Sequence, residues 1–356
     1  MKILAIDIGA GTQDILLYDS GKKLENCIKL VLPSPSPLLA DEVARLGGRS
    51  REIFIAGHTV GGGVLSHTIK TLARDHQVIM TPAAAYTLRN NLDDVVANGI
   101  ELRAETAGAQ SVSIYLDELD LSPLQRLLAS VGENHHDVLA AAVAVQDHGA
   151  YQSGQSNRKT RLSHMKSRLE ENPDPLALSY LYGEVPDIFP RMVSAAERLH
   201  EQLPGRQILV MDTAPAAIAG CLTDKRVRER ANGKLLLVNA GNGHTLACAL
   251  DEGKIIALLE HHTRELESAS FADYLEAFCS GKARDEDPYM ASGHGLFYLE
   301  KPSGIENLDL IAITGPNRDI LEGSGLDFYY PAPGGDMMMT GPMGLVEAVK
   351  YKSSAR

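Results

Sequence analysis

The sequence contains no tryptophan, and only 5% of its 356 residues are aromatic. Proteins that bind single-stranded nucleic acids stack the bases on aromatic side chains, so a surface of this kind is not expected. Basic residues are also outnumbered by acidic ones, and the formal net charge is -12. The nearest basic block, NRKTR at 157–161, is short and is interpreted as a solvated loop. The composition therefore argues against a nucleic-acid or anionic-membrane partner.

Long apolar runs are missing as well. No stretch approaches the roughly 20 apolar residues of a membrane-spanning helix. The first apolar run is interrupted by Asp7 and carries no signal-peptide cleavage site. We therefore expect no membrane contact and a cytoplasmic location.

Cysteine is rare, and its spacing is uninformative for metal binding. The four cysteines lie far apart and form no C-x-x-C pair, which predicts single buried thiols rather than a zinc or iron–sulfur site. They are Cys27, Cys221, Cys248 and Cys279.

The 12 histidines match no recognised metal-ligand spacing such as H-E-x-x-H. The adjacent pairs at 135–136 and 261–262 are predicted to be solvated or locally bonded. His58 ends a strand-like run and precedes a row of glycines. Together with the loop AVQDHGA at 144–150, it could line a substrate cleft at the carboxyl ends of strands. The candidate substrate residues are His58, Gly61, Gly62, Asp147 and His148.

The length is sufficient for two domains. The runs KILAIDI, DILLYD and CIKLVL, joined by short turn-rich links, predict an antiparallel meander. Strand-like and helix-like runs then alternate, which indicates an α/β fold. Within this part, PAAAYTLRNNLDDVVANG at 82–99 is predicted to be one helix. Residues 151–190 are polar and irregular apart from a helical stretch, and they are interpreted as a lid or an insertion.

The second half repeats the opening pattern. Residues 234–263 again predict a strand, a glycine-rich turn, a strand, a short turn and a third strand. The likeness lies in the pattern, with little identity between side chains. We interpret it as an approximate internal duplication.

The two glycine turns are the strongest functional signal. Glycines at a hairpin tip let backbone amides point at phosphate oxygens, and a nearby hydroxyl adds a donor. Asp7, beside the first turn, could hold the water molecules around a Mg²⁺ ion. The alternative is a pair of ordinary hairpin turns, but two copies in matching contexts favour phosphate binding. The candidate residues are Gly9, Gly11, Thr12 and Gln13 in the first turn, and Asn239, Gly241, Asn242, Gly243, His244 and Thr245 in the second.

These motifs resemble the actin, sugar-kinase and heat-shock-chaperone ATPase superfamily. AIDIGAGTQDILLYD and LLLVNAGNGHTLACAL resemble its two phosphate motifs, MDTAPAAIAGCL resembles its connecting motif, and LIAITGPN, with Gly315, resembles its adenosine motif. Their order along the chain is also the order in the superfamily. The resemblance implies ATP or ADP with Mg²⁺ as cofactors.

The resemblance also implies an architecture. The expected fold is α/β, with two ribonuclease-H-like (actin-like ATPase) domains facing a nucleotide cleft. We expect an N-terminal domain at 1–222 and a C-terminal domain at 223–356, with the last helix, in GGDMMMTGPMGLVEAVK, returning to the first domain.

The whole chain is more similar still to a small family labelled "putative pyruvate formate-lyase activating proteins". That label implies radical chemistry on an iron–sulfur cluster held by three closely spaced cysteines. The sequence has no such triplet, so we reject the label as a mechanism.

Two acidic positions bear on catalysis. Asp212 matches the acidic residue of the connecting motif and could act as a general base, although an aspartate before a helix is also a good N-cap. Asn239 stands where the second phosphate motif usually has a metal-supporting aspartate. The amide keeps an acceptor oxygen but loses the charge on which metal affinity and in-line phosphoryl transfer depend.

Three functions stay open at this point. The first is an ATP-dependent kinase or ATPase acting on a small metabolite. The second is a nucleotide-dependent activator or sensor of a protein partner, with little turnover of its own. The third is a degenerate member that binds another phosphorylated ligand in the same cleft.

Overall fold

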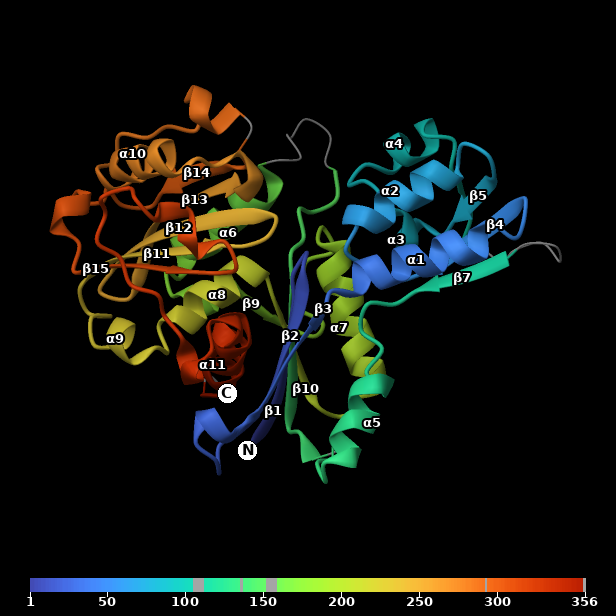
Figure 1. Cartoon of the computed structure of the whole chain (residues 1–356), viewed down its shortest axis with the longest axis horizontal. Helices are drawn as coiled ribbons and strands as arrows, with labels where there is room; N and C mark the ends of the chain where they lie inside the picture. Colours follow the sequence, from blue (N-terminus) through green and yellow to red (C-terminus); the bar gives the residue numbers. More distant parts are fainter. Residues whose placement is uncertain (105–111, 135–136, 152–158, 292, 355–356) are drawn as a thin grey trace.

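The computed structural model describes residues 1–104, 112–134, 137–151, 159–291 and 293–354. Its strands form three sheets, of six, five and four strands. Figure 1 shows a central sheet seen nearly edge-on, with one lobe on either side of it. Among the described residues, no helix combines the length and the apolar character needed to cross a membrane.

The N-terminal sheet begins with the predicted meander, which is confirmed. Its strand order is β3-β2-β1-β8-β10-β9, with β1 to β3 antiparallel and with β8 and β10 parallel to β1. The strands are β1 (Lys2–Ile8), β2 (Thr12–Asp19), β3 (Ile28–Pro33), β8 (Ala140–Val145), β9 (Ser179–Leu181) and β10 (Gln207–Met211). All six residues of β8 are buried, as expected for a parallel strand covered on both faces.

The C-terminal sheet repeats this plan. A second antiparallel meander of β11, β12 and β13 is followed by β15, which lies parallel to β11, and β14 extends the opposite edge. The strands are β11 (Lys234–Ala240), β12 (His244–Asp251), β13 (Lys254–His262), β14 (Gly295–Tyr298) and β15 (Leu310–Thr314). The expected fold class, two ribonuclease-H-like units, is therefore confirmed.

A third lobe is inserted between β3 and β8, and the sequence did not indicate it as a separate unit. Its four strands are all parallel, in the order β6-β5-β4-β7, and they enclose a core of their own. Its elements are α1 (Pro35–Gly47), β4 (Glu52–Gly57), α2 (Gly63–Leu72), β5 (Gln77–Met80), α3 (Pro82–Ala85), α4 (Leu92–Ala97), β6 (Glu101–Leu102) and β7 (Val112–Leu116).

The single helix predicted over 82–99 is wrong. The structure has two short helices there, because each begins at its own polar cap. The Thr81 hydroxyl accepts a hydrogen bond from the Ala84 amide, and the Asn91 side chain accepts one from the Asp93 amide. Such caps satisfy free amides at a helix start and so favour a new helix after the intervening turn.

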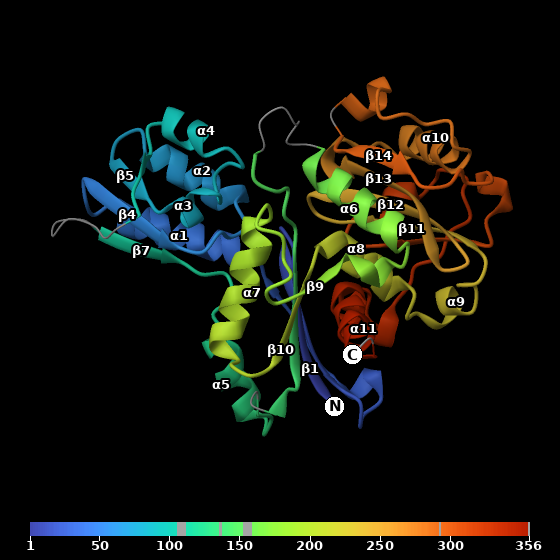
Figure 2. The same cartoon turned by 180° about the vertical axis from the view of Figure 1, so that it is seen from behind.

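Helices cover both faces of the central sheet. One core is shared by the N-terminal and C-terminal sheets and by α8 (Thr213–Cys221) and α11 (Thr340–Ser354). The opposite face packs on α5 (Ser122–Ser130) and α7 (Pro190–Gln202), as the two opposite views in Figures 1 and 2 show. The last helix thus lies on strands of the N-terminal sheet, while the domain boundary proposed at residue 222 stays a prediction.

The crossing of α8 and α11 depends on glycine. A Cβ atom on Gly220 would overlap the carbonyl oxygen of Thr340, and one on Gly344 would overlap the carbonyl oxygen of Ala216. The two backbones therefore approach more closely than any larger residue allows. This contact fixes the junction between the N-terminal and C-terminal sheets.

The segment 151–190 is not simply a polar lid. From residue 159 onward it is described, and α6 (Thr160–Glu171) buries Leu162, Met165 and Leu169 in the shared core. Further along, β9 pairs with β10 at the sheet edge. The apolar face of α6 explains this packing, because its buried residues recur at helical spacing.

Candidate functional site

A cavity of about 580 Å³ lies where the three lobes meet. Both glycine turns contribute to its wall, together with the insertion lobe, the end of β8 and the start of α11. Its volume is within the usual range for small-molecule sites. Thirteen of the candidate residues line it: Asp7, Gly9, Thr12, Gly61, Gly62, Asp147, His148, Asn239, Gly241, Asn242, Gly243, His244 and Gly315.

Five other candidates do not line the cavity: Gln13, Thr245 and His58, and also Gly11 and Asp212, which are described below. The Gln13 side chain donates to the Pro33 carbonyl at 3.3 Å, on the outside of the hairpin. Thr245 is fully buried, and its hydroxyl shares a hydrogen bond with the Thr263 hydroxyl, 3.0 Å away. His58 lies with its Nε2 atom 3.3 Å from the Tyr115 hydroxyl. The structure therefore does not bring these side chains to a ligand in the cavity.

The two glycine turns have the same backbone geometry. The Gly9 amide donates to the Thr12 carbonyl at 2.9 Å, and the Gly241 amide donates to the His244 carbonyl at 3.0 Å. The amides of the next two residues in each turn, at 10–11 and 242–243, donate to no acceptor within the described residues. Free amides at a turn are the donors that an anion requires.

The turns also lie against each other. Gly11 is not in the cavity wall, but a Cβ atom there would overlap the side-chain nitrogen of Asn242. A larger residue at this position would require the Asn242 side chain to move, so the two hairpins are in close contact here. Gly315, in contrast, is required: its φ angle is +97°, and a Cβ atom would overlap the Ala240 carbonyl oxygen.

Two carboxylates face each other across the first hairpin. Asp7 and Asp14 are direct partners in the β1–β2 register, so their side chains emerge on the same face. The Oδ1 atom of each is buried and has no hydrogen-bond partner within the described residues. Burial, followed by the charges of Asp14 and Asp212, raises the pKa of Asp7 well above its usual value. Burial also raises the pKa of Asp14, to about 7.

This pair fits a hard divalent cation. Mg²⁺ prefers one or two carboxylates together with water molecules, and a cation would compensate two neighbouring negative charges. A Cβ atom on Gly341, at the start of α11, would overlap the Asp7 carboxylate, so the helix N-terminus closes over this acid. Sequence reasoning missed Asp14, although its position seven residues after Asp7 in a tight hairpin could have indicated it.

Asp212 belongs to a buried ionic cluster. Arg161 donates to both of its carboxylate oxygens, at 2.8 and 2.5 Å, and also to Glu260 Oε1. Burial alone would lower the pKa of the Arg161 guanidinium, but the charges of Asp212 and Glu260 outweigh it, so that pKa is raised. The Ala214 amide donates to Asp212 at 3.1 Å, which confirms the N-cap. Its role as a general base stays a prediction.

The prediction that the basic block NRKTR at 157–161 is a solvated loop is therefore wrong for Arg161. Residues 157–158 lie outside the described part of the chain, but Arg161 is only 2% exposed and is not solvated. It is buried because two acids, on different lobes, supply its counter-charge. Asp212 directly follows β10 of the N-terminal sheet, and Glu260 lies on β13 of the C-terminal sheet.

Asp147 caps α7. One of its oxygens accepts from the Gly149 amide at 2.8 Å, and the other accepts from the amides of Arg191 and Met192 at 2.7 and 3.1 Å. The Arg191 guanidinium lines the cavity and forms two hydrogen bonds with Glu118, of 2.8 and 2.9 Å. Sequence reasoning missed this cation, because nothing local distinguishes Arg191 from a surface arginine.

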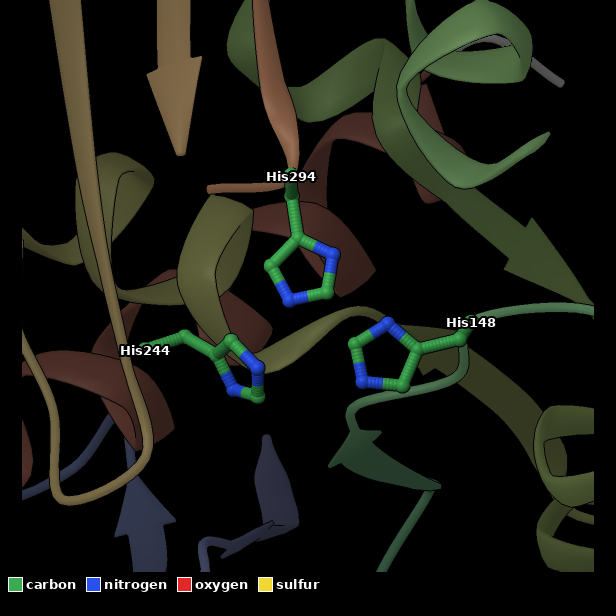
Figure 3. A group of neighbouring side chains, drawn as sticks. All are labelled: His148, His244 and His294. Atoms are coloured by element: carbon green, nitrogen blue, oxygen red, sulfur yellow. The ribbon is translucent and has the colours of Figure 1, made fainter. Parts of the chain in front are cut away.

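Three histidines converge at the cavity wall (Figure 3). One nitrogen from each of His148, His244 and His294 lies within 4.8 Å of the others. Burial lowers the pKa of His148 well below its usual value and lowers that of His244 to about 2. The sequence placed His148 with the substrate residues and His244 with the phosphate turn, and it did not indicate His294. The pair at 135–136 lies outside the described residues, whereas His261 is buried and locally bonded, as predicted.

The duplicated meander, the parallel strands beside it and the cavity between the glycine turns define a protein of the actin-like ATPase fold class. A family model matches residues 60–320. The chain belongs to that family, whose description reads "Putative pyruvate format-lyase activating enzyme (DUF1786)".

Solved structures with a similar fold are distant in sequence. An inorganic polyphosphate/ATP-glucomannokinase from Arthrobacter sp. strain KM has 11% identity and a TM-score of 0.38, over 100% of this chain and 99% of that chain. The activator of the 2-hydroxyisocaproyl-CoA dehydratase from Clostridium difficile, with bound ADPNP, has 9% identity and a TM-score of 0.36, over 100% and 98%. No curated protein matched the chain. These values carry no conclusion about function.

The cysteines do not fit the iron–sulfur cluster that the family description implies. All four are described, and all are free and buried, as predicted. Cys279 lies in the core of the C-terminal lobe, apart from the other three, and none lines the cavity. Burial raises the pKa of the thiols of Cys221 and Cys248, which disfavours the thiolate form that binds iron.

Proposed function

We propose that this protein binds ATP or ADP with Mg²⁺ in the cavity, and that it is a kinase or ATPase acting on a small metabolite. In this proposal the free amides of Ala10, Asn242 and Gly243, which line the cavity, bind the phosphates, and the base lies near Gly315. The observation that carries the proposal is the pair of matching turns with free amides, which face one cavity next to two unpartnered carboxylate oxygens.

The residues present fit a magnesium ion. Asp7 and Asp14 would hold it through oxygen atoms or bound water, and the ion would supply charge compensation for the phosphates. The protein's own groups would position the ligand. The turn amides would orient the phosphates, and the start of α11, at Gly341, would exclude water from one side of Asp7.

The metabolite would occupy the part of the cavity beside the insertion lobe. Gly61 and Gly62 line this part together with Asp147 and Arg191. The Gly61 amide donates to Glu118 Oε2 at 2.9 Å, so Glu118 fixes both the loop and the Arg191 guanidinium. Glu118 compensates the charge of this guanidinium, so Arg191 positions the loop and adds no net positive charge to this part of the wall.

A second candidate function is a nucleotide-dependent activator or sensor with little turnover, whose partner is another protein. The observation that favours it is Asn239, which lines the cavity where the resembled motif has an aspartate. An amide retains an acceptor oxygen but lacks the charge that supports metal-assisted phosphoryl transfer. The two candidates differ in turnover and share the binding site.

The binding site is tested by calorimetry with ADP and ATP, with and without Mg²⁺. The Asp7→Asn variant keeps the side-chain size and removes the charge, and we expect it to lose at least about tenfold in Mg²⁺-dependent affinity, which is about 1.4 kcal/mol. Asp19→Asn, at the other end of the same hairpin, is the matched control and should bind like the unmodified chain. Equal affinities for Asp7→Asn and the control would contradict the proposal.

Turnover separates the two candidates. Phosphate release from ATP is measured with a panel of small metabolites. Release stimulated by one metabolite supports the kinase or ATPase, and tight ADP binding without stimulated release supports the activator.

A further inference from the structure

The histidine cluster at the cavity wall is built from segments that lie far apart in the sequence. His148 follows β8 of the N-terminal sheet, His244 begins β12, and His294 directly precedes β14. In Figure 3 the three rings face a common centre. Their ring centroids are 4.7 to 5.1 Å apart, and the rings of His148 and His294 are nearly parallel, at 11°.

The imidazoles of the cluster are neutral, which is the form that a metal ion binds. The Nε2 atom of His244 is buried and has no hydrogen-bond partner within the described residues. The main-chain amide of His294 donates to the main-chain carbonyl of Glu260 at 3.1 Å, so His294 lies beside the strand that carries one acid of the Arg161 cluster. That cluster contains the guanidinium of Arg161 and the carboxylates of Asp212 and Glu260. Burial, together with the positive charge of Arg161, lowers the pKa of His148 and His244 and keeps both imidazoles neutral. One Glu260 oxygen is also buried and unpartnered.

We propose that His148, His244 and His294 bind one divalent transition-metal ion of the first row, with Zn²⁺ as the reference case. The site is separate from the magnesium position at Asp7 and Asp14, and the proposal does not depend on nucleotide binding. Three neutral imidazoles are a ligand set that Zn²⁺ accepts and that Mg²⁺, which prefers oxygen, does not.

The geometry requires the three nitrogen atoms to approach one another and one ring of the stacked pair, His148 or His294, to rotate, because the lone pair of each nitrogen lies in its ring plane. Zinc–nitrogen bonds of about 2.0–2.1 Å in a tetrahedral site place nitrogen atoms roughly 3.4 Å apart. The separations of up to 4.8 Å must shorten to that value when the ion binds. Because His148 belongs to the N-terminal half and the other two belong to the C-terminal sheet, the ion would draw these halves together across the cavity.

The ion would also be accessible to a ligand. His148 and His244 line the cavity, whereas His294 is buried behind them. The coordination positions that the histidines leave open therefore face the cavity, where water or an oxygen atom of a bound small molecule can occupy them. Three protein ligands with an open position are the pattern of catalytic zinc sites.

The test uses the full chain after treatment with a chelator. Co²⁺ is titrated while the visible absorption of the bound ion is recorded, and Zn²⁺ is then added in competition. We expect one Co²⁺ per chain, a spectrum typical of four-coordinate nitrogen ligation, and displacement by Zn²⁺. Absence of this spectrum, or binding that Mg²⁺ abolishes at equal concentration, would overturn the proposal.

Variants identify the ligands. His148→Gln, His244→Gln and His294→Gln should each weaken Co²⁺ binding at least about tenfold, because loss of a residue that only supports a ligand already costs about 10–100-fold. His67→Gln removes an exposed imidazole on α2 and should bind like the unmodified chain. Circular dichroism identifies any variant that does not fold. The Co²⁺ affinities of the folded variants then show whether the three histidines are ligands. Binding that is equal in the folded cluster variants and in the control contradicts the site.

One measurement keeps this inference apart from the proposed function. His294 does not line the cavity, so His294→Gln should lose the metal ion and still bind ADP. Loss of ADP binding in the Asp7→Asn variant, with Co²⁺ binding retained, is the converse result. If the two binding events are lost together in both variants, the sites are not separate and this inference fails.

Discussion

Replacing Arg161 with leucine should be among the most destabilising single substitutions in this chain. The guanidinium is 2% exposed, and its two partners, Asp212 and Glu260, are 4% and 0% exposed. Removing one partner from a buried ion pair costs about 3–5 kcal/mol, because the remaining charge is left uncompensated. Arg161 compensates two carboxylates that lie on different sheets. We therefore expect the free energy of unfolding to fall by about 4–5 kcal/mol.

The assay is urea unfolding followed by far-ultraviolet circular dichroism. Lys159→Met is the matched control, because Lys159 directly precedes α6 and pairs with Asp285 of the C-terminal lobe. The Lys159 side chain is 58% exposed, so loss of its ion pair should cost less than about 1 kcal/mol. The two variants thus remove one positive charge each from neighbouring positions and differ mainly in burial.

A third variant tests the cause. Combining Arg161→Leu with Asp212→Asn and Glu260→Gln removes the buried charges together, and it should recover a large part of the lost stability. If Arg161→Leu is no less stable than Lys159→Met, the buried cluster does not hold the lobes together and this reasoning is wrong. If the triple variant recovers nothing, uncompensated charge is not the cause.

Three further predictions concern glycine and asparagine positions. Gly344→Ala should lower the thermal midpoint by the equivalent of about 1–3 kcal/mol, because the added methyl group meets the Ala216 carbonyl oxygen; an unchanged midpoint would show that the helices separate freely. Gly315→Ala should weaken ADP binding in calorimetry and lower the midpoint, since its φ of +97° is strained for alanine; unchanged values for both would contradict the prediction. Asn239→Asp should raise steady-state phosphate release from ATP, and release that stays the same or falls would mean that another carboxylate has replaced the missing charge.

The meanders and the glycine turns could be predicted because their signals are local. Alternating apolar residues and turn formers determine a hairpin within about 20 residues, and the same pattern at 2–31 and 234–263 indicated the duplication. The insertion lobe could not be recognised in the same way. Whether β4 pairs with β7 in a separate sheet, or joins the central one, depends on contacts between distant segments.

The residues of the candidate site also differ in whether local or distant contacts determine their positions. Residues of the turns were found because sequence neighbours form them. His294 and Arg161 were missed because their roles depend on partners about 50 to 150 residues away, such as His148 and Glu260. His58 was misplaced for a related reason, since the end of a strand does not determine which side of the loop its side chain occupies. The pairing of Asp7 with Asp14 is an intermediate example. The two residues are close in the sequence, but their contact depends on the register of the hairpin.

The position of α11 has a consequence for synthesis of the chain. The helix covers one face of the first sheet to be translated and packs in the same core as β1 and β8. Ile3 of β1 pairs with Ala140 in the parallel register, so this pairing cannot form until residue 140 has been synthesised. The N-terminal sheet therefore keeps an apolar face uncovered until residues 340–354 leave the ribosome. Partly synthesised chains with such a face are prone to aggregate, and a chaperone that shields it would act during elongation.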